Sequence, residues 1–227
     1  MPLFVLLLAL TAIFGPQLWA RRVLRRYGRV RSDLPGSGAE LARHLLKAAG
    51  MADYSVACAE GTMGDHFNPE SRQVVLSPAH HDRRSLAAAV VAAHEVGHAI
   101  QHHIGFRPLF IRQRLVRVSF IAEKIASLLL VAMPLLTVAT RAPGVGAACL
   151  LAGLSILLFP ILVHTVTLPV EFDASFKRAL PILSSGYLAQ SDLRAARTIL
   201  MACALTYVAA ALSGLLNFAR WFQILRR

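Results

Sequence analysis

A run rich in alanine and valine, from Leu86 to Ile100, contains the pentapeptide His94-Glu95-Val96-Gly97-His98. Its apolar flanks predict a helix buried on nearly all sides. Residues four apart share one face of a helix, so His94 and His98 can present two imidazoles to one Zn²⁺, with Glu95 beside the open coordination position. Two surface histidines would be the alternative. Burying two imidazoles and a carboxylate without a partner is costly, however, and a metal ion supplies that partner.

A catalytic zinc site needs a third protein ligand and one position for water. Gln101 and Ile104 stand where the metzincin motif has a glycine and a histidine, so this ligand must come from elsewhere. Glu171 is the candidate, because acidic residues are scarce in the second half of the chain and Pro169 can open a helix there. Asp173 could then accept a hydrogen bond from a ligating histidine. Alternatively, both carboxylates only complement the N-terminus of that helix.

Two further residues are candidates for contact with a substrate. His66 follows Asp65 in a predicted turn and could line a cleft, although a histidine in a turn is more often only a turn residue. Arg178 lies two turns beyond Glu171 on the same predicted helix face. It could bind substrate or stabilise an oxyanion, or it could face a lipid headgroup or solvent.

The composition predicts an integral membrane protein, because 56% of the residues are hydrophobic and only 16% are charged. Residues 1–20 are predicted as a transmembrane anchor, 125–168 as a transmembrane hairpin and 199–219 as a fourth transmembrane segment. Arginines follow the first apolar run instead of preceding it, which indicates a retained anchor with a cytoplasmic downstream side. The last segment ends in arginines, so it could also pack without crossing.

Between the first and second spans, residues 32–113 are predicted to form a small α+β zincin-like catalytic region that carries the motif helix. Ser37 begins an amphipathic helix that ends near Gly50. Tyr54–Ala59 and Gln73–Leu76 are predicted strands. An edge strand beside the metal helix could hold an extended peptide as an added strand. Residues 169–198 are predicted as the helix and loop with the third ligand. The fold class is therefore mainly α and integral membrane, with about four transmembrane helices.

The net charge of +12 points to the lipid bilayer as a partner and not to nucleic acid, because no aromatic-rich basic motif accompanies it. Three widely spaced cysteines favour neither a disulfide framework nor a cysteine zinc site. If the spans alternate, the motif helix and the region after Pro169 lie on the same side of the membrane. This arrangement predicts a multi-pass membrane protein with its site on the cytoplasmic side. The sequence leaves the oligomeric state open.

Five stretches of the chain resemble a known family, the bacterial membrane neutral zinc metallopeptidases of the YugP type. The stretches are Ser37–Ala42, Asp65–Pro69, Ala92–His102, Leu168–Ser175 and Ala204–Ala210. The resemblance implies a membrane-embedded metalloprotease with His94 and His98 as ligands and Glu95 as the catalytic base. More loosely, the chain resembles gluzincin-type membrane proteases. In these, an aspartate typically follows the ligand glutamate by four residues, whereas Ser175 holds that position here.

The expected function is therefore hydrolysis of peptide bonds by zinc-activated water, with a peptide or membrane protein as substrate. A second hypothesis is a non-catalytic zinc-binding membrane scaffold that binds partners. A structural zinc site normally has four protein ligands, and the sequence offers no obvious fourth. A third is an intramembrane protease, which is disfavoured because the motif helix is short for a span.

Overall fold

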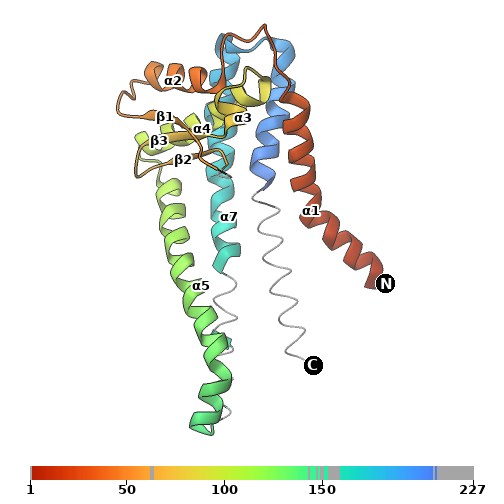
Figure 1. Ribbon diagram of the computed structural model, residues 1–227, viewed down its shortest axis with the longest axis vertical. Coiled ribbons are helices and arrows are strands. Elements are labelled where there is room, and N and C mark those ends of the chain that lie inside the picture. The colour runs from red at the N-terminus through yellow and green to blue at the C-terminus, as the bar shows by residue number, and fades with distance from the viewer. Residues whose placement is uncertain are drawn as a thin grey trace.

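The computed structural model describes residues 2–61, 64–142 and 159–206, with a few isolated positions at 144–146, 148, 151–152 and 208. The elements in chain order are α1 (Pro2–Tyr27), α2 (Gly38–Ala48), β1 (Ser55–Cys58), β2 (His66–Asn68), β3 (Gln73–Leu76), α3 (Pro78–His81), α4 (Leu86–His103), α5 (Arg107–Thr140), α7 (Phe159–Phe172), the π-helix η1 (Asp173–Ala179), α8 (Leu180–Ile182), η2 (Leu183–Tyr187) and η3 (Gln190–Asp192). A further helix covers 193–206. Figure 1 shows a head that holds the sheet and α2 to α4, from which α5 and α7 extend side by side.

Helix α4 is the centre of the head, as the alanine-rich run predicts. Ser85 caps its N-terminus, where the side-chain oxygen accepts a hydrogen bond from the Ala88 amide at 3.1 Å. Fifteen of its residues are buried. Their small side chains allow α2 and η1 to approach α4 closely. The predicted helix is confirmed and extends three residues further, to His103.

The three-stranded sheet lies against α4 and has the order β1-β3-β2. β1 pairs with β3 in parallel, with Val56 opposite Val74, and β2 pairs with β3 antiparallel, with Phe67 opposite Val74. Both predicted strands are confirmed. The segment predicted only as a turn at Asp65–Pro69 also contains a strand, β2, because its pairing with β3 depends on contacts remote in sequence. β2 is an edge strand of this sheet.

Helix α2 packs against α4 and matches its prediction. Ser37 and Glu40 form a reciprocal capping box, in which the Ser37 hydroxyl accepts from the Glu40 amide and the Glu40 carboxylate accepts from the Ser37 amide. Gly50 follows the last turn with a φ of +70°, a conformation that glycine adopts without strain. The buried face of α2 therefore has a fixed position against the motif helix.

The close contact between α4 and η1 depends on Gly97, the fourth residue of the pentapeptide. A Cβ atom built at this position would lie 2.7 Å from the carbonyl oxygen of Ala174, which is too close for a side chain. The absence of a side chain at Gly97 lets the backbone of η1 pass directly over the motif. This approach brings the end of α7 to the two histidines of α4.

The prediction of an integral membrane fold with about four spans is wrong, although the mainly helical content and the small sheet agree with the sequence. Among the described residues, no helix by itself is both long and apolar enough to cross a membrane. Two parts of α5, Arg107–Leu129 and Val131–Thr140, meet these criteria only together and are bent by 45°.

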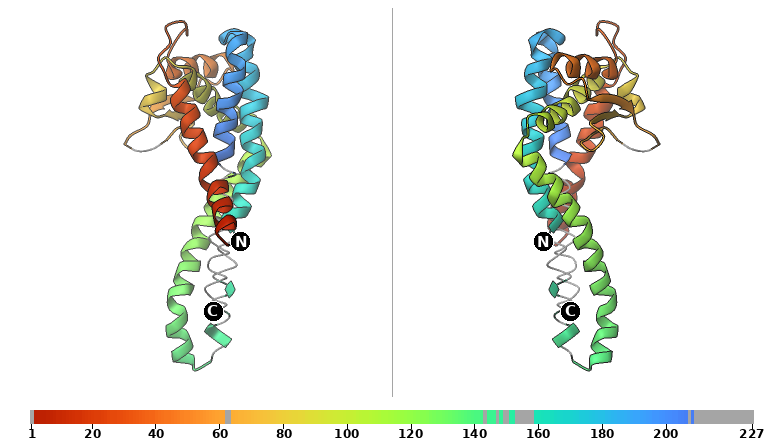
Figure 2. Two further views of the ribbon diagram at one scale, coloured as in Figure 1. Left: turned by 90° about the vertical axis from the view of Figure 1, so that its right-hand side faces the viewer. Right: turned by 90° about the vertical axis from the view of Figure 1, so that its left-hand side faces the viewer.

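Some apolar residues that the sequence assigned to spans are buried in the core that includes α4. Ala20 of α1 lies in this core together with Ile199 and Leu200 of the helix 193–206. The two helices lie beside each other in Figures 1 and 2. The predicted segments 125–168 and 199–219 extend outside the described residues, at 143, 147, 149–150, 153–158, 207 and 209–219.

Candidate metal centre

Three buried side chains from two distant parts of the chain converge on one point. His94 and His98 lie one turn apart on α4, and their Nε2 atoms are each 3.3 Å from Oε2 of Glu171. Their exposed fractions are 4%, 5% and 0%. The candidate ligand atoms of this group all lie within 4.8 Å of one another. The structure therefore brings together the three predicted ligands.

Glu171 does not begin a helix, contrary to the prediction. It lies in the last turn of α7, and Pro169 is inside that helix, which continues directly into η1. The alternative role for Glu171, complementing a helix N-terminus, is therefore excluded. A π-helix widens the backbone at this point, and such segments are frequent at functional sites.

The donor set fits a zinc ion, because the buried Glu171 carboxylate faces two imidazole nitrogens and neither of its oxygens accepts a hydrogen bond from the residues that the structure describes. Burial by itself would raise the pKa of Glu171, but its electrostatic interactions with His98 and His94 outweigh this effect and hold the pKa well below its usual range. A carboxylate facing two imidazole nitrogens needs positive charge between them, and two nitrogens with one oxygen are common zinc ligands.

The remaining ring nitrogen of each histidine has its own buried partner. Nδ1 of His94 lies 3.0 Å from the hydroxyl of Ser175, and Nδ1 of His98 lies 2.9 Å from Oε1 of Gln101. Such partners orient a ligating imidazole and leave Nε2 for the metal. Ser175 thus contacts one histidine from the position four residues after Glu171.

Glu95 lies beside these ligands and is 7% exposed. Burial raises the pKa of its carboxyl group to about 7, while His94 acts in the opposite direction and Glu171 adds to the rise. A carboxyl group with a pKa near neutrality can both accept and donate a proton at physiological pH. Its surroundings therefore suit a general acid and base.

A cavity of about 460 Å³ opens beside Glu95 and His98. Its lining includes His66 and Phe67 of the strand β2, and Arg112 of α5. NH1 of Arg112 lies 3.5 Å from Oε1 of Glu171. The cavity is therefore lined by Glu95, by the candidate ligand His98, by an edge strand and by an arginine.

Asp65 fixes the loop that leads into β2. Its carboxylate accepts hydrogen bonds from the amide and hydroxyl of Ser77, at 2.8 and 3.0 Å, and lies 2.7 Å from Nδ1 of His80. Burial tends to raise the pKa of Asp65, but the bonds from His80 and Ser77 outweigh this and lower it. The wall that carries His66 is therefore anchored to α3.

Of the further candidates, His66 lines the cavity, whereas Asp173 and Arg178 contact residues other than those expected. Oδ2 of Asp173 accepts hydrogen bonds from Nε2 of Gln101 and Nε of Arg178, at 2.8 and 2.7 Å, and these donors are not the candidate ligand histidines. The guanidinium of Arg178 also lies over the ring of Phe106 at 5.6 Å. Arg178 is thus engaged in this network and is not among the residues that line the cavity.

Sequence reasoning missed the roles of Gln101, Ser175 and Arg112. Gln101 and Ser175 carry a weak signal, because each lies one helical turn from a predicted ligand. Arg112 had no local signal, since α5 meets α7 only through the tertiary fold.

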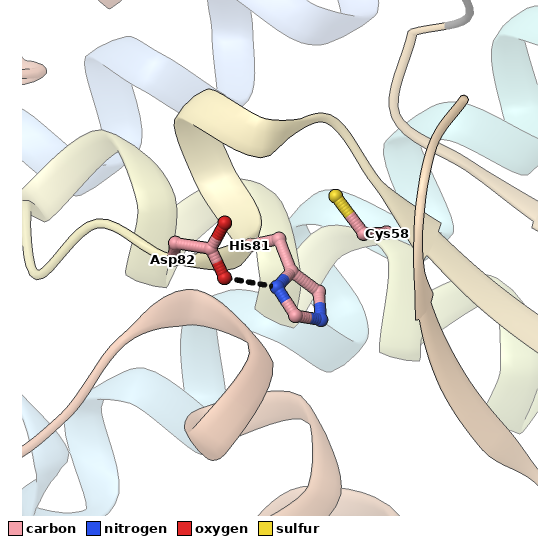
Figure 3. A group of neighbouring side chains, drawn as sticks. All are labelled: Cys58, His81 and Asp82. Atoms are coloured by element: carbon pink, nitrogen blue, oxygen red, sulfur yellow. Dashed lines mark hydrogen bonds and ion pairs between the residues drawn. The ribbon is translucent and has the colours of Figure 1, made fainter. Parts of the chain in front are cut away.

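A second group with possible metal ligands, Cys58, His81 and Asp82, lies at the surface near the end of β1 (Figure 3). In this group His81 and Asp82 already bond to each other, and Cys58 and Asp82 are exposed. These solvated side chains do not require a metal ion. Cys58 and Cys203 are free thiols, while Cys149 lies outside the described residues.

Comparison with known proteins agrees with this geometry. A family model described as "Putative neutral zinc metallopeptidase" matches residues 2–226. A protein of Bacillus subtilis (strain 168), named "Putative membrane protease YugP", is 35% identical over 224 residues, which cover 98% of this chain and 95% of that protein. No solved structure matches significantly. The family name implies zinc, and the group formed by His94, His98 and Glu171 is a possible site for it. Because the family model spans nearly the whole sequence, this chain belongs to the putative neutral zinc metallopeptidase family.

Proposed function

We propose that this protein is a zinc metallopeptidase in which His94, His98 and Glu171 bind one zinc ion and Glu95 is the general base. The observation that carries the proposal is the convergence of two Nε2 atoms on a fully buried carboxylate, 3.3 Å from each. A buried carboxylate without satisfied hydrogen bonds is costly unless a cation completes it.

The proposed reaction is hydrolysis of a peptide bond by water. A bound zinc ion supplies a Lewis acid that polarises the peptide carbonyl and acidifies water near neutral pH. Glu95 takes a proton from the water whose oxygen attacks the carbonyl carbon. As the carbon–nitrogen bond breaks, Glu95 passes this proton to the leaving amine. The raised pKa of Glu95 supports both transfers.

The substrate would lie extended along β2. This strand is at the edge of the sheet and lines the cavity next to Glu95, so its free backbone groups can pair with a peptide strand. His66 and Phe67 of β2 also contribute to the cavity wall. An extended peptide or an unfolded segment of a protein is therefore the proposed class of substrate.

Arg112 is the proposed donor to the carbonyl oxygen of the substrate, because it lines the cavity and its NH1 lies 3.5 Å from the candidate ligand Glu171. Replacing Arg112 with methionine is expected to lower kcat by about 100- to 1,000-fold, as for loss of an oxyanion donor, and to change zinc affinity by less than about tenfold. Peptide hydrolysis and chelator competition measure the two effects separately. A variant with normal kcat would exclude this role.

We extend membrane association to this chain because its relative is named a membrane protease. The exposed arginines Arg21, Arg22 and Arg25 of α1 suit an anionic surface such as the cytoplasmic leaflet. Substrates would then include proteins met at that surface. Fractionation of cells that express the chain tests this extension, which recovery in the soluble fraction alone would contradict.

The experiment that tests the function is digestion of an unfolded protein such as reduced casein by the purified full chain. Cleavage is expected to stop with a zinc chelator and to return when zinc is added back, because the metal ion is part of the reacting centre. A chain that binds zinc but cleaves no member of a broad peptide library would instead support the non-catalytic scaffold. A structural zinc site normally has four protein ligands, whereas the described group offers three. This difference argues against the scaffold.

A further inference from the structure

Gln101 is a fully buried polar residue at the junction of α4 with α7 and η1. Its side chain has an exposed fraction of 0%, and every polar atom of the amide has a partner. Oε1 lies 2.9 Å from Nδ1 of His98, and Nε2 donates to the carbonyl oxygen of Val170 and to Oδ2 of Asp173, both at 2.8 Å. One amide therefore contacts a candidate ligand, the residue before another candidate ligand, and a buried carboxylate.

The acceptors around Gln101 determine which way its amide points. Val170 offers a carbonyl oxygen, and Oδ2 of Asp173 already accepts from Nε of Arg178, so both positions require N–H donors. Turning the amide over would place its oxygen against two other oxygens. Oε1 must therefore face His98, and it can only accept a hydrogen bond there.

This orientation places the proton of His98 on Nδ1. The Nδ1–H group donates to Oε1 of Gln101, and the lone pair of Nε2 is directed at the position next to Glu171. His94 differs, because the Ser175 hydroxyl beside its Nδ1 can either donate or accept. Gln101 thus specifies the tautomer of one ligand, which Ser175 does not do for the other.

We propose that Gln101 is a positioning residue that fixes the metal-binding tautomer of His98 and the register of α7, so that Glu171 meets the histidines before zinc arrives. This inference rests on the proposed zinc site. The bond to Val170 fixes the turn that carries Glu171, because the two residues are adjacent in the chain. Asp173 accepts a hydrogen bond from the Gln101 amide and another from Arg178, and these bonds hold the amide in place.

The first test compares Gln101→Met with Gln190→Met, which changes an exposed glutamine. In ¹⁵N-histidine-labelled, metal-free protein, wild-type His98 is expected to carry a proton on Nδ1, and Gln101→Met is expected to lose it or expose it to fast exchange. Zinc affinity, measured by competition with a chromophoric chelator, is expected to fall about 10- to 100-fold in Gln101→Met and to stay unchanged in the control.

A second test reverses the polarity of the contact between Gln101 and Asp173. Gln101→Glu can still accept from His98 but sets a carboxylate against Asp173, so zinc binding should weaken. The double variant Gln101→Glu/Asp173→Asn provides a donor for that carboxylate and should recover part of the affinity. A role in packing alone predicts no such recovery.

The inference is overturned if wild-type His98 carries its proton only on Nε2, or if folded Gln101→Met binds zinc like the wild type. A wild-type chain that binds no zinc would contradict the proposed function. The site of protonation on His98 in the metal-free protein would then still decide the role of Gln101.

Discussion

Replacing Glu95 with glutamine is expected to lower peptide hydrolysis by about 100- to 10,000-fold, the usual contribution of a general base. Glutamine has nearly the same shape as glutamate but cannot accept the proton of the attacking water. Because Glu95 lies beside the ligands and is not one of the three that converge, zinc content should stay near the wild-type value. Initial rates of casein digestion and metal analysis of the same preparation measure both quantities.

Glu60→Gln is the matched control for this variant, because Glu60 is exposed and is not among the residues lining the cavity. It should digest casein at the wild-type rate. Retained hydrolysis in Glu95→Gln would reject Glu95 as the base. Loss of zinc together with activity would show that Glu95 supports the metal site, and its role in proton transfer would then fail this test.

Glu171→Gln is expected to weaken zinc binding by more than about 100-fold, beyond the effect typical of residues that only orient a ligand. The amide keeps the volume of the side chain but removes the negative charge that faces both Nε2 atoms. At zinc concentrations 100 times the wild-type Kd, zinc should stabilise the wild type by about 2.7 kcal/mol. Under the same conditions, zinc should raise the free energy of unfolding of the variant by much less.

Urea unfolding with and without zinc measures this difference, and chelator competition gives the affinity. Glu60→Gln again serves as the control, since it removes an exposed carboxylate that is not among the three converging side chains. Wild-type zinc affinity in Glu171→Gln would mean that the third ligand is another residue. The proposed centre would then have to be abandoned in its present form.

Local sequence rules were sufficient for the parts of the site that lie on one helix. The spacing of His94 and His98 fixes their shared face, and Ser85 caps the helix as its residue type predicts. Glu171 was predicted by scarcity of other carboxylates and by the chemical need for a third ligand. The predicted start of the helix that carries Glu171 was wrong, because Pro169 lies inside α7 and does not begin it.

The remaining features depend on contacts between distant residues. Gln101 and Asp173 are 72 positions apart, so no local pattern reveals their hydrogen bond. Hydrophobicity alone also could not separate lipid-facing residues from core residues. Ala20 and Ile199 lie in segments whose composition is typical of a membrane span. Both residues are nevertheless buried in the core that includes the motif helix.

The most direct measurement is the zinc content of the purified full chain, determined beside Glu171→Gln. The proposed centre predicts about one zinc ion per wild-type chain, removed by a chelator and restored by added zinc, and a clear deficit in the variant. A folded wild type that contains no zinc and cannot be loaded with it would contradict the proposed metallopeptidase.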